Sequence, residues 1–354
     1  MSDLKIVLLV CAVLLVGATA LSVVRSGRWW IRGCDFPRMQ IAVLLAVLLP
    51  VHLALYGVSS WLDGLVAGAL LASLAYQLWR IVPYTPLHRP QVARATATGG
   101  GRSIRFMVAN VLMTNRRADD LLALVREADP DLLLTVETDG WWDRRLSVLD
   151  RDYPWSVKHP LDNTYGLHLF SRLELVDPQL RFLMRDDTPS VQTRVRLASG
   201  DLIDFWGLHP RPPSPGQDTE KRDAEILLVG EEVKVAARPA IVAGDLNDTA
   251  WSHTSRLFQR ISHTLDPRIG RGMYATFHAR WPIFRWPLDH VFHDASFTLV
   301  HLERLAYFGS DHFPVLAELR YAPHAESRQS EPPDADEEEE NEARARIDEG
   351  KRAD

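Results

Sequence analysis

The sequence predicts an α/β sandwich, in which helices cover β-sheets, preceded by three membrane-spanning helices. Three long uncharged apolar runs occupy most of the first 82 residues. From residue 104 onward, short apolar runs alternate with segments whose apolar residues recur at helical spacing. Short apolar runs are typical of buried strands, and their alternation with amphipathic helices is typical of layered α/β domains.

The first apolar run covers residues 6–24 and contains no charge between Lys5 and Arg25. At about 1.5 Å per residue, it is long enough to cross a hydrocarbon core of roughly 30 Å. The second uncharged run covers residues 39–62, and the third, which is shorter, covers residues 64–79. A cleaved signal peptide is the alternative for the first run, but two more apolar runs follow it directly. We therefore predict a multi-pass anchor in the lipid bilayer.

Arginines around these runs bear on the side of the membrane that the domain occupies. The loop after the first run and the segment after the third contain Arg25, Arg28, Arg32, Arg38, Arg80, Arg89 and Arg94. The positive-inside rule favours the cytoplasm for the domain and the outside for the N-terminus. A short N-terminus that stays inside would give the opposite arrangement, so the side remains open. A composition rich in Arg and Ala suits a bacterium, and hence its cytoplasmic membrane.

Composition divides the chain into four parts. Residues 1–82 form the anchor, and residues 83–103, rich in Pro, Thr and Gly, predict a linker that is flexible around Gly99-Gly100-Gly101. Residues 104–321 form the α/β domain. Residues 322–354 are expected to be a disordered acidic tail, because a dense run of like charge cannot be buried in a core.

Net charge and cysteine content narrow the class of protein only slightly. The chain has 40 basic and 46 acidic residues, which gives a formal net charge of −6 and no argument for the basic face of a nucleic-acid-binding protein. Its two cysteines, Cys11 and Cys34, both precede the domain. Neither a disulfide framework nor a cysteine-type zinc site can therefore be built in the domain.

Within the domain, the pattern predicts strands and helices in mixed order. The strands are predicted at residues 104–109, 132–136, 167–170, 191–197, 202–208, 240–243, 291–292 and 314–319. The helices are predicted at residues 118–127 and 218–235, where apolar residues recur on one face. Polar residues follow several of the strands directly.

These polar residues carry the functional argument. They are Asn110, Glu137, His209, Asp245, Asn247, Asp289, Asp311 and His312. Glu137 ends a buried run, where a carboxylate must be solvated, paired or bound to a metal ion. Mg²⁺ prefers one or two carboxylates together with water and substrate oxygens, and Asn110 would add an oxygen ligand unless it only begins a turn. Carboxylates, amides and histidines at one sheet edge suit metal-assisted attack on a phosphate ester.

Asp245, Asn247 and His209 each have a functional interpretation and a plainer one. On an extended continuation of the strand, residues two apart face the same way, so Asp245 and Asn247 would reach one phosphate or metal ion. The alternative is an ordinary Asx turn. His209 ends another strand and could donate to a phosphoryl oxygen as charge develops. The alternative is an exposed loop histidine.

The adjacent residues Asp311 and His312 need separate partners, because consecutive side chains diverge in an extended chain. We expect His312 to pair with a carboxylate that is distant in sequence. Such a partner would raise the basicity of His312 and fix its tautomer, which would make it a general base for water. Asp311 would then serve the metal ion or another histidine.

In this order, the motifs resemble those of the endonuclease/exonuclease/phosphatase (DNase-I-like) superfamily over residues 104–321. The resemblance implies a four-layer α-β-β-α sandwich of two central sheets flanked by helices. It also implies a site for Mg²⁺, or Mn²⁺, at Asn110 and Glu137, with Glu137 as the principal ligand. Asp311 would complete the metal or acid network.

The resemblance further implies roles for the remaining polar residues. His209 would stabilise phosphoryl oxygens or assist the leaving group. Asp245 would orient or deprotonate the attacking water, and Asn247 would hold the phosphate. His312 would act as a base or a phosphate ligand, and Asp289 would support a histidine.

The sequence departs from the family pattern at two positions. Val136 stands where Gln usually precedes the glutamate, so one polar contact to substrate is missing. Leu246 stands where Phe is common. Neither change removes a catalytic group.

The anchor bears on the substrate, because it holds the domain near lipid head groups and raises their effective concentration. We therefore expect a phosphoester or pyrophosphate substrate that is lipid-linked, with residues 274–287 as a lipid-facing or substrate-selecting loop. Core packing with a surface loop is the equal alternative for that segment. A membrane-tethered nuclease for DNA or RNA is the second hypothesis, with Arg211 and Arg271 near the phosphates. An inactive scaffold is the third, and the complete motif set argues against it. No protein partner is predicted.

Overall fold

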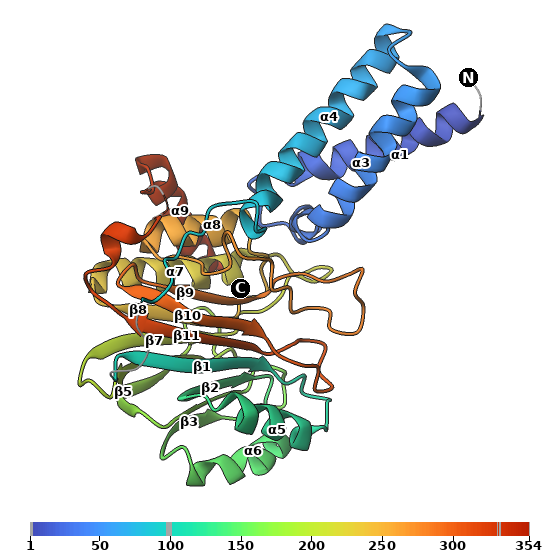
Figure 1. The fold of residues 1–354 in the computed structure, drawn as a ribbon. Helices are drawn as coiled ribbons and strands as arrows, with labels where there is room; N and C mark the ends of the chain where they lie inside the picture. The colour runs from blue at the N-terminus through green and yellow to red at the C-terminus, as the bar shows by residue number, and fades with distance from the viewer. Residues whose placement is uncertain (1–2, 97–100, 331, 333, 354) are drawn as a thin grey trace.

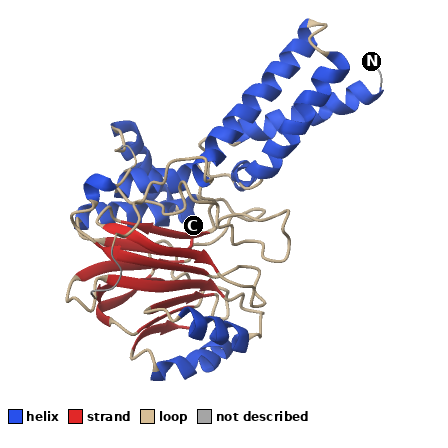
Figure 2. Ribbon diagram, in the orientation of Figure 1, coloured by secondary structure: helices blue, strands red, loops and turns tan. Residues whose placement is uncertain are grey.

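The computed structural model describes residues 3–96, 101–330, 332 and 334–353. Figure 1 shows a bundle of long helices that stands on one corner of a domain built around two sheets. Figure 2 shows further helices on the two outer faces of those sheets. The domain therefore has helices outside and strands inside, as the sequence predicts.

The strands form a six-stranded and a five-stranded sheet. The first sheet has, in spatial order, β10 (Phe297–Arg304), β11 (Val315–Tyr321), β1 (Ser103–Asn110), β2 (Leu132–Val136), β4 (Leu167–Ser171) and β3 (Trp155–His159). The second has β5 (Glu174–Arg181), β6 (Ser190–Arg196), β7 (Leu202–Leu208), β8 (Ala240–Asp245) and β9 (Asp289–His293). Parallel pairing joins β1 with β2 and β7 with β8. The carboxyl ends of each parallel pair therefore meet at one edge.

Three apolar clusters hold four layers together. The cluster between the sheets includes Phe106 and Phe205, whose rings meet edge to face with centroids 6.0 Å apart. On the outer face of the first sheet lie α5 (Ala118–Ala128), α6 (Gly140–Leu146) and η3 (Ser147–Arg151). On the outer face of the second lie α7 (Glu220–Ala236), α8 (His253–Ser262) and α9 (Glu337–Arg352). The predicted four-layer α-β-β-α sandwich is confirmed.

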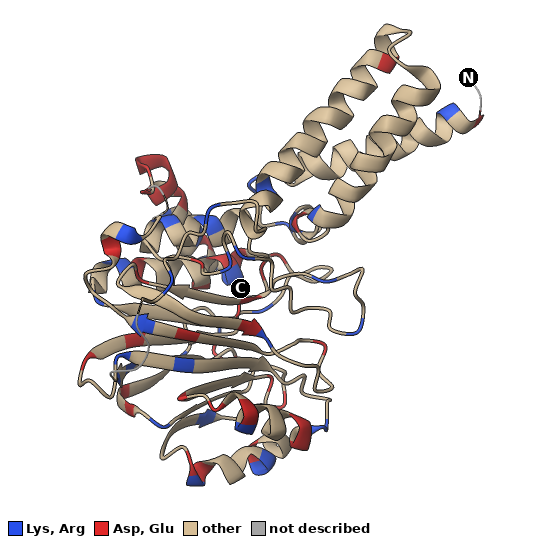
Figure 3. Ribbon diagram, in the orientation of Figure 1, with Lys and Arg blue, Asp and Glu red and all other residues tan. Residues whose placement is uncertain are grey.

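The bundle consists of α1 (Asp3–Leu21), α3 (Arg38–Tyr56) and α4 (Trp61–Ile81). By length and composition, these three helices are apolar enough to cross a membrane. Figure 3 shows that charged residues lie near the helix ends and that the middle of the bundle has none. At the end far from the domain, Lys5 Nζ lies 2.6 Å from Asp63 Oδ1. Short helices α2 (Trp29–Arg32), η1 (Gly33–Asp35) and η2 (Val82–Tyr84) connect the bundle to the domain.

The boundary between the second and third apolar helices differs from the boundary that the sequence predicted. The uncharged run was expected to continue to residue 62, but α3 ends at Tyr56 and Gly57 follows with a φ of 58°. The side chain of Ser60 then caps α4 by accepting the Asp63 N–H. A glycine with positive φ commonly ends a helix, and a serine at the N-cap commonly begins one. Both signals act regardless of nearby charge.

The predicted flexible linker is packed against the domain where the structure describes it. Ala95 N donates to Leu299 O (2.9 Å) and Leu299 N donates to Ala93 O (3.0 Å), so the segment adds to the edge of β10. Val92 is fully buried. The expected flexibility around Gly99 and Gly100 concerns residues outside the described ones. An open strand edge, which sequence composition does not reveal, explains the packing of residues 83–96.

The prediction of a disordered tail is wrong for Glu337–Arg352, which form α9. Asp336 and Glu339 make a capping box, and the acidic residues of the first turn oppose the positive end of the helix dipole. Ala343 and Ile347, four residues apart, are buried in the cluster that includes α7. The sequence prediction missed this helix because the two apolar residues that pack one face of it against the domain lie within a densely charged segment.

Candidate active site

The polar residues singled out in the sequence come together because of strand pairing. Asn110 ends β1 and Glu137 directly follows the parallel strand β2. Asp245 ends β8, pairs in register with Asp289 at the start of β9, and lies beside His209, which follows β7. Asp311 and His312 precede β11, which runs antiparallel to β1 and so begins where β1 ends. All these side chains therefore lie at one rim of the sandwich.

Asn110 links the two sheets. Its Nδ2 donates to Glu137 Oε1 (2.9 Å) and to Asp245 Oδ2 (3.0 Å). Its Oδ1, which was expected to offer a metal ligand, accepts the Leu112 N–H at 3.0 Å. The side chain therefore positions two carboxylates relative to each other across the sandwich.

Glu137 is the carboxylate with the environment that best fits a divalent cation. Its backbone has a φ of 64°, a left-handed conformation that a non-glycine residue adopts at a cost and that is common at functional sites. Burial, with a smaller contribution from the negative charge of Asp311, raises the pKa of Glu137 to about 6 against the hydrogen bonds from Asn110 and Met113 and the positive charge of His312. A buried carboxylate with a second carboxylate near it is an oxygen donor set suited to Mg²⁺.

His312 lies between two carboxylates, both distant in sequence. Its Nδ1 is 2.8 Å from Asp289 Oδ2, and its Nε2 is 3.5 Å from Asp245 Oδ2. Burial alone would disfavour the charged ring, but the charges of Asp245 and Asp289 outweigh burial and raise the pKa of His312 to about 10. The ring is therefore protonated near neutral pH, with Nδ1 donating to Asp289 and Nε2 in an ion pair with Asp245.

The side chains of Asp245, Asp289 and His312 offer ligand atoms within 4.8 Å of one another, which is close enough to hold a metal ion. A protonated imidazole has no lone pair for a metal, so the trio is a charge cluster while the ring keeps its proton and a candidate metal site if the ring loses it. The raised pKa favours the cationic ring, and the predicted role of His312 as a general base would require the ring to lose this proton. Burial also raises the pKa of Asp245, although the positive charge of His312 opposes this.

His209 is buried, which rules out the alternative of an exposed loop histidine. Its Nε2 lies 3.9 Å from Asp245 Oδ2, and its Nδ1 has no hydrogen-bond partner among the described residues. Burial lowers the pKa of His209 to about 4, so the ring is neutral at pH 7. Tyr165 covers it, with ring centroids 5.4 Å apart. The site thus contains one neutral and one cationic histidine.

Asn247 does not continue the strand as expected. Its φ is 50°, and its N–H donates to Asp245 Oδ1 (2.9 Å), which is the Asx turn named as the alternative. Its Nδ2 donates to Pro210 O (3.0 Å), so the amide fixes the loop after His209. The turn requires Gly244, because a Cβ there would lie 1.9 Å from Leu208 O.

Asp248 is a buried residue of the site that sequence reasoning did not single out, although it closes the same motif. It accepts hydrogen bonds from Ser252 and from Ser255 Oγ (3.0 Å), and it lies 3.4 Å from Arg222 Nη2. Arg222 Nη1 also donates to Asn247 O (2.7 Å). Asp248 and Arg222 therefore hold the backbone of the turn that carries Asp245.

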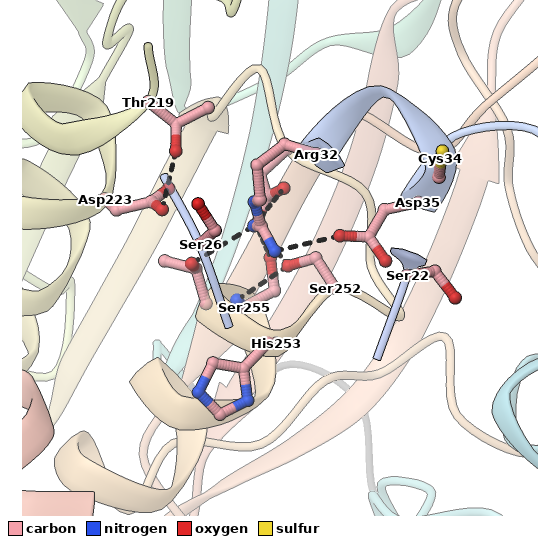
Figure 4. Close-up of polar contacts among 12 residues, drawn as sticks. Ser22, Ser26, Arg32, Cys34, Asp35, Thr219, Asp223, Ser252, His253 and Ser255 are labelled. Carbon is pink, nitrogen blue, oxygen red and sulfur yellow. Dashed lines mark hydrogen bonds and ion pairs between the residues drawn. The ribbon is translucent and has the colours of Figure 1, made fainter. Parts of the chain in front are cut away.

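The loop between α1 and α3 reaches this same motif. Figure 4 shows Arg32 between Asp35 of its own loop and serines of the domain. Arg32 Nη1 donates to Asp35 Oδ2 (2.8 Å), and Nη2 donates to Asp248 Oδ1 (3.4 Å) and Thr254 Oγ1 (3.2 Å). Arg32 is only 3% exposed. The helical bundle is thus tied to the rim of the site by a buried ion-pair network.

A two-sheet sandwich whose strand ends gather carboxylates, an amide and buried histidines is the fold of a hydrolase of phosphoester bonds. Residues 107–312, more than half of the chain, match the model of the Endonuclease/Exonuclease/phosphatase family. The chain belongs to this family, whose members typically depend on divalent metal ions.

Solved structures share the fold at low sequence identity. The human Nocturnin catalytic domain with bound sulfate anion is 18% identical, with a TM-score of 0.51 over 66% of this chain and 100% of that one. D. rerio TDP2 complexed with single strand DNA product is 15% identical, with a TM-score of 0.51 over 62% and 99%. A functionally unknown conserved protein from Enterococcus faecalis V583 is 17% identical, with a TM-score of 0.51 over 62% and 100%. A search of curated proteins finds no match.

Proposed function

We propose that the protein is a phosphoesterase dependent on Mg²⁺ or Mn²⁺ that hydrolyses a lipid-linked phosphoester or pyrophosphate in its own membrane. The observation that carries this proposal is the position of residues 274–287, which run between the candidate active site and the bundle. We propose that the three helices span the bacterial cytoplasmic membrane, with the domain on the cytoplasmic side that the arginine distribution favours.

One end of this segment lies against the catalytic rim. The ring of Phe277 is 4.9 Å from that of His312, and Ala279 N donates to Asp311 O at 2.6 Å. Arg280 Nη2 donates to Gly309 O at 2.9 Å. The segment therefore forms a wall of the site, and a change in its position would change the packing around His312.

The other end of the segment lies against the start of α3. The side chain of Gln40 donates to Ile283 O, and the rings of Phe36 and Trp286 meet edge to face at 5.6 Å. Because the apolar span begins at Arg38, this contact lies at the height proposed for the membrane surface.

Large apolar side chains of the segment remain exposed. Trp281, Ile283 and Phe284 are 62%, 71% and 54% exposed. Apolar and aromatic side chains beside a spanning helix enter the interfacial layer of a bilayer favourably. The segment would therefore carry the apolar part of a substrate from the bilayer to the rim.

The proposed roles follow the electrostatics of the site. Glu137 and Asp311 would hold the divalent cation, which when bound neutralises charge on the phosphoryl oxygens. Asp245 would orient the attacking water and take its proton, because burial makes this carboxylate a better base. Neutral His209 and cationic His312 would donate hydrogen bonds to phosphoryl oxygens, as phosphoryl transfer relies on positioning and charge stabilisation.

Two supporting roles complete the proposal. Asp289 would hold His312 in place through Nδ1. Asn247, expected to hold the phosphate, would act through the loop after His209, because its amide nitrogen is engaged with Pro210.

The proposal is tested by phosphate release from a polyprenyl pyrophosphate by full-length protein in detergent micelles, with duplex DNA cleavage measured in the same buffer. Ile283→Ser should lower hydrolysis of the lipid substrate and leave hydrolysis of a small soluble phosphodiester unchanged. Val235→Ser, at an apolar residue on α7 that is also largely exposed, is the matched control and should change neither. Equal loss on both substrates would contradict a lipid-guiding role.

The membrane-tethered nuclease is the second candidate. One relative by fold, TDP2, was solved with a single strand DNA product. Two arginines expected to face nucleic acid are already engaged, however. Arg211 pairs with Asp187, and Arg271 donates to the carbonyls of Pro267 and Val92. DNA cleavage without release from the lipid substrate would favour the nuclease over our proposal.

A further inference from the structure

A cavity lies where α4 enters the domain, apart from the candidate active site. It has a volume of about 430 Å³ and is lined by the end of α4, the segment after it and α8. Figure 1 shows the lower end of α4 meeting the helical layer that contains α8. A cavity of this size is large enough for a small polar ligand.

The charge of the cavity has one sign. Its lining includes Arg80, Arg89, Arg256 and Arg260, and no Asp or Glu is among the described residues that line it. Arg260 is neutralised by Glu339 at 2.7 Å. Arg256 is different, because its Nε donates only to Ser252 O (3.1 Å) and no carboxylate among the described residues pairs with it.

Arg256 is held in an unfavourable environment. Burial, together with the positive charge of Arg80, lowers the pKa of Arg256 to about 10. A guanidinium that is buried beside another cation is costly unless an anion compensates it. No side chain in the described part of the cavity supplies that anion.

Gln259 gives an independent sign of a missing ligand. This side chain is only 4% exposed, lines the cavity, and has an Nε2 group without a hydrogen-bond partner among the described residues. A buried donor of this kind is normally satisfied, since leaving it unpaired costs free energy. An acceptor that reached Nε2 would satisfy it, and the arginines of the cavity favour one that is negatively charged.

The cavity also lies at the level of the proposed membrane surface. Trp79 is part of its lining and is 64% exposed, and the guanidinium of Arg80 stacks over its ring at 4.1 Å. Tryptophan and arginine at the end of a spanning helix are typical of the head-group layer.

We propose that this cavity binds a phosphate-bearing anion at the membrane surface, and that the headgroup of an anionic phospholipid supplies the phosphate. Arg256 and Gln259 would donate to its oxygens, and Trp79 would lie beside its glycerol. The headgroup assignment rests on the proposed membrane insertion, whereas the anion site rests on the cavity alone. The bound lipid would stabilise the junction between bundle and domain.

The test uses full-length protein reconstituted into phosphatidylcholine vesicles with increasing fractions of phosphatidylglycerol, with the thermal unfolding midpoint as the readout. Ligand binding to the folded state raises this midpoint. Wild-type protein should be stabilised as the anionic fraction increases. Arg256→Gln should need about tenfold more anionic lipid or more for the same rise, as expected for loss of a hydrogen bond to a charged group.

Gln259→Leu gives a distinct signature. In pure phosphatidylcholine it should unfold at or above the wild-type midpoint, because it removes an unsatisfied buried donor. It should nevertheless lose the response to phosphatidylglycerol, which a merely structural role of Gln259 would not produce. Arg126→Gln, an exposed arginine on α5, is the control for general surface charge and should respond as wild type does.

Three outcomes would overturn parts of the proposal. An unchanged response in Arg256→Gln and Gln259→Leu would overturn the site. Saturation of the site by inorganic phosphate in pure phosphatidylcholine would keep the anion site and overturn the headgroup as its ligand. Failure of wild-type protein to float with vesicles would overturn membrane insertion, independently of any binding result.

Discussion

Replacement of Arg32 by methionine tests whether the bundle is locked to the catalytic rim. Arg32 Nη1 donates to Asp35, and Nη2 donates to Asp248 and Thr254, all inside the protein. Burial disfavours its charge, but the surrounding carboxylates outweigh this and raise its pKa, so Arg32 stays charged. Methionine keeps much of the length of the side chain and removes the charge and the donors.

The size of the loss in the free energy of unfolding depends on the partners that Asp35 and Asp248 retain after Arg32 is replaced. Removal of one partner of a buried ion pair costs about 3–5 kcal/mol when the other charge is left alone. Here Asp35 keeps Arg38 at 2.5 Å, and Asp248 keeps Arg222 at 3.4 Å and two serine hydroxyls. We therefore expect the lower end, a loss of about 3 kcal/mol in the free energy of unfolding. Arg32→Lys should lose less, because it keeps the charge but not the planar fork.

The assay is urea unfolding of the detergent-solubilised full-length protein, followed by circular dichroism. Fluorescence gives a local reading, since Trp251 Nε1 donates to Asp35 O (2.7 Å) and so senses release of the loop. Arg28→Met is the matched control, because Arg28 lies in the same loop and is exposed. It should change the free energy of unfolding by less than about 0.5 kcal/mol.

The reasoning fails if Arg32→Met loses less than about 1 kcal/mol, the scale of an exposed ion pair. It also fails if the loss equals that of Arg28→Met. Catalysis provides a second check, because Asp248 holds the turn that carries Asp245. Arg32→Met should lower turnover without changing the affinity of Glu137 and Asp311 for Mg²⁺.

Four further outcomes are expected. Glu137→Ala and His312→Ala should each abolish turnover without unfolding the domain; unfolding seen by circular dichroism, or full activity, would contradict the site assignment. Removal of divalent ions by EDTA should abolish phosphate release and added Mg²⁺ should restore it, whereas an unaffected rate would argue against a metal-dependent reaction. Asp289→Asn should lower turnover about 100-fold through misplacement of His312, a loss typical of one acid–base group, and a turnover number within twofold of wild type would show that the contact is dispensable. Burial raises the pKa of Glu225 from 4.5 to about 7. Its contribution to stability is therefore complete below pH 4.5 and is lost as pH rises to about 7. Urea unfolding should show a decline of about 3 kcal/mol in the free energy of unfolding across that window, and the decline should be absent in Glu225→Gln.

The central strands were predictable from sequence because burial on both faces makes them continuously apolar. β2 and β7 coincide with the predicted ranges, and β1 and β8 differ by one or two residues at their ends. The missed strands β3, β5 and β10 all lie at sheet edges. Edge strands are half exposed, so their sequences need fewer apolar residues, and β5 even contains a proline and an irregular register.

The site was predictable as a set of positions but not as a geometry. Each polar residue follows an apolar run, and parallel pairing brings such ends together whatever the loops do. The Asx turn at Asn247 and the charge on His312 depend on neighbours from other strands. Arg32 lies 216 residues from Asp248, so no local pattern connects them.

The packed segment of residues 83–96 has a consequence for kinetics. A domain on a flexible tether samples a volume set by the length of the tether, whereas this one is held at a fixed height by backbone pairing to β10 and by Arg32. With the helices in the bilayer and a lipid-linked substrate, as we propose, such an enzyme would meet its substrate by diffusion in two dimensions. Its rate should therefore follow the mole fraction of substrate in the bilayer: dilution with inert lipid should slow it, and dilution of the vesicles with buffer should not.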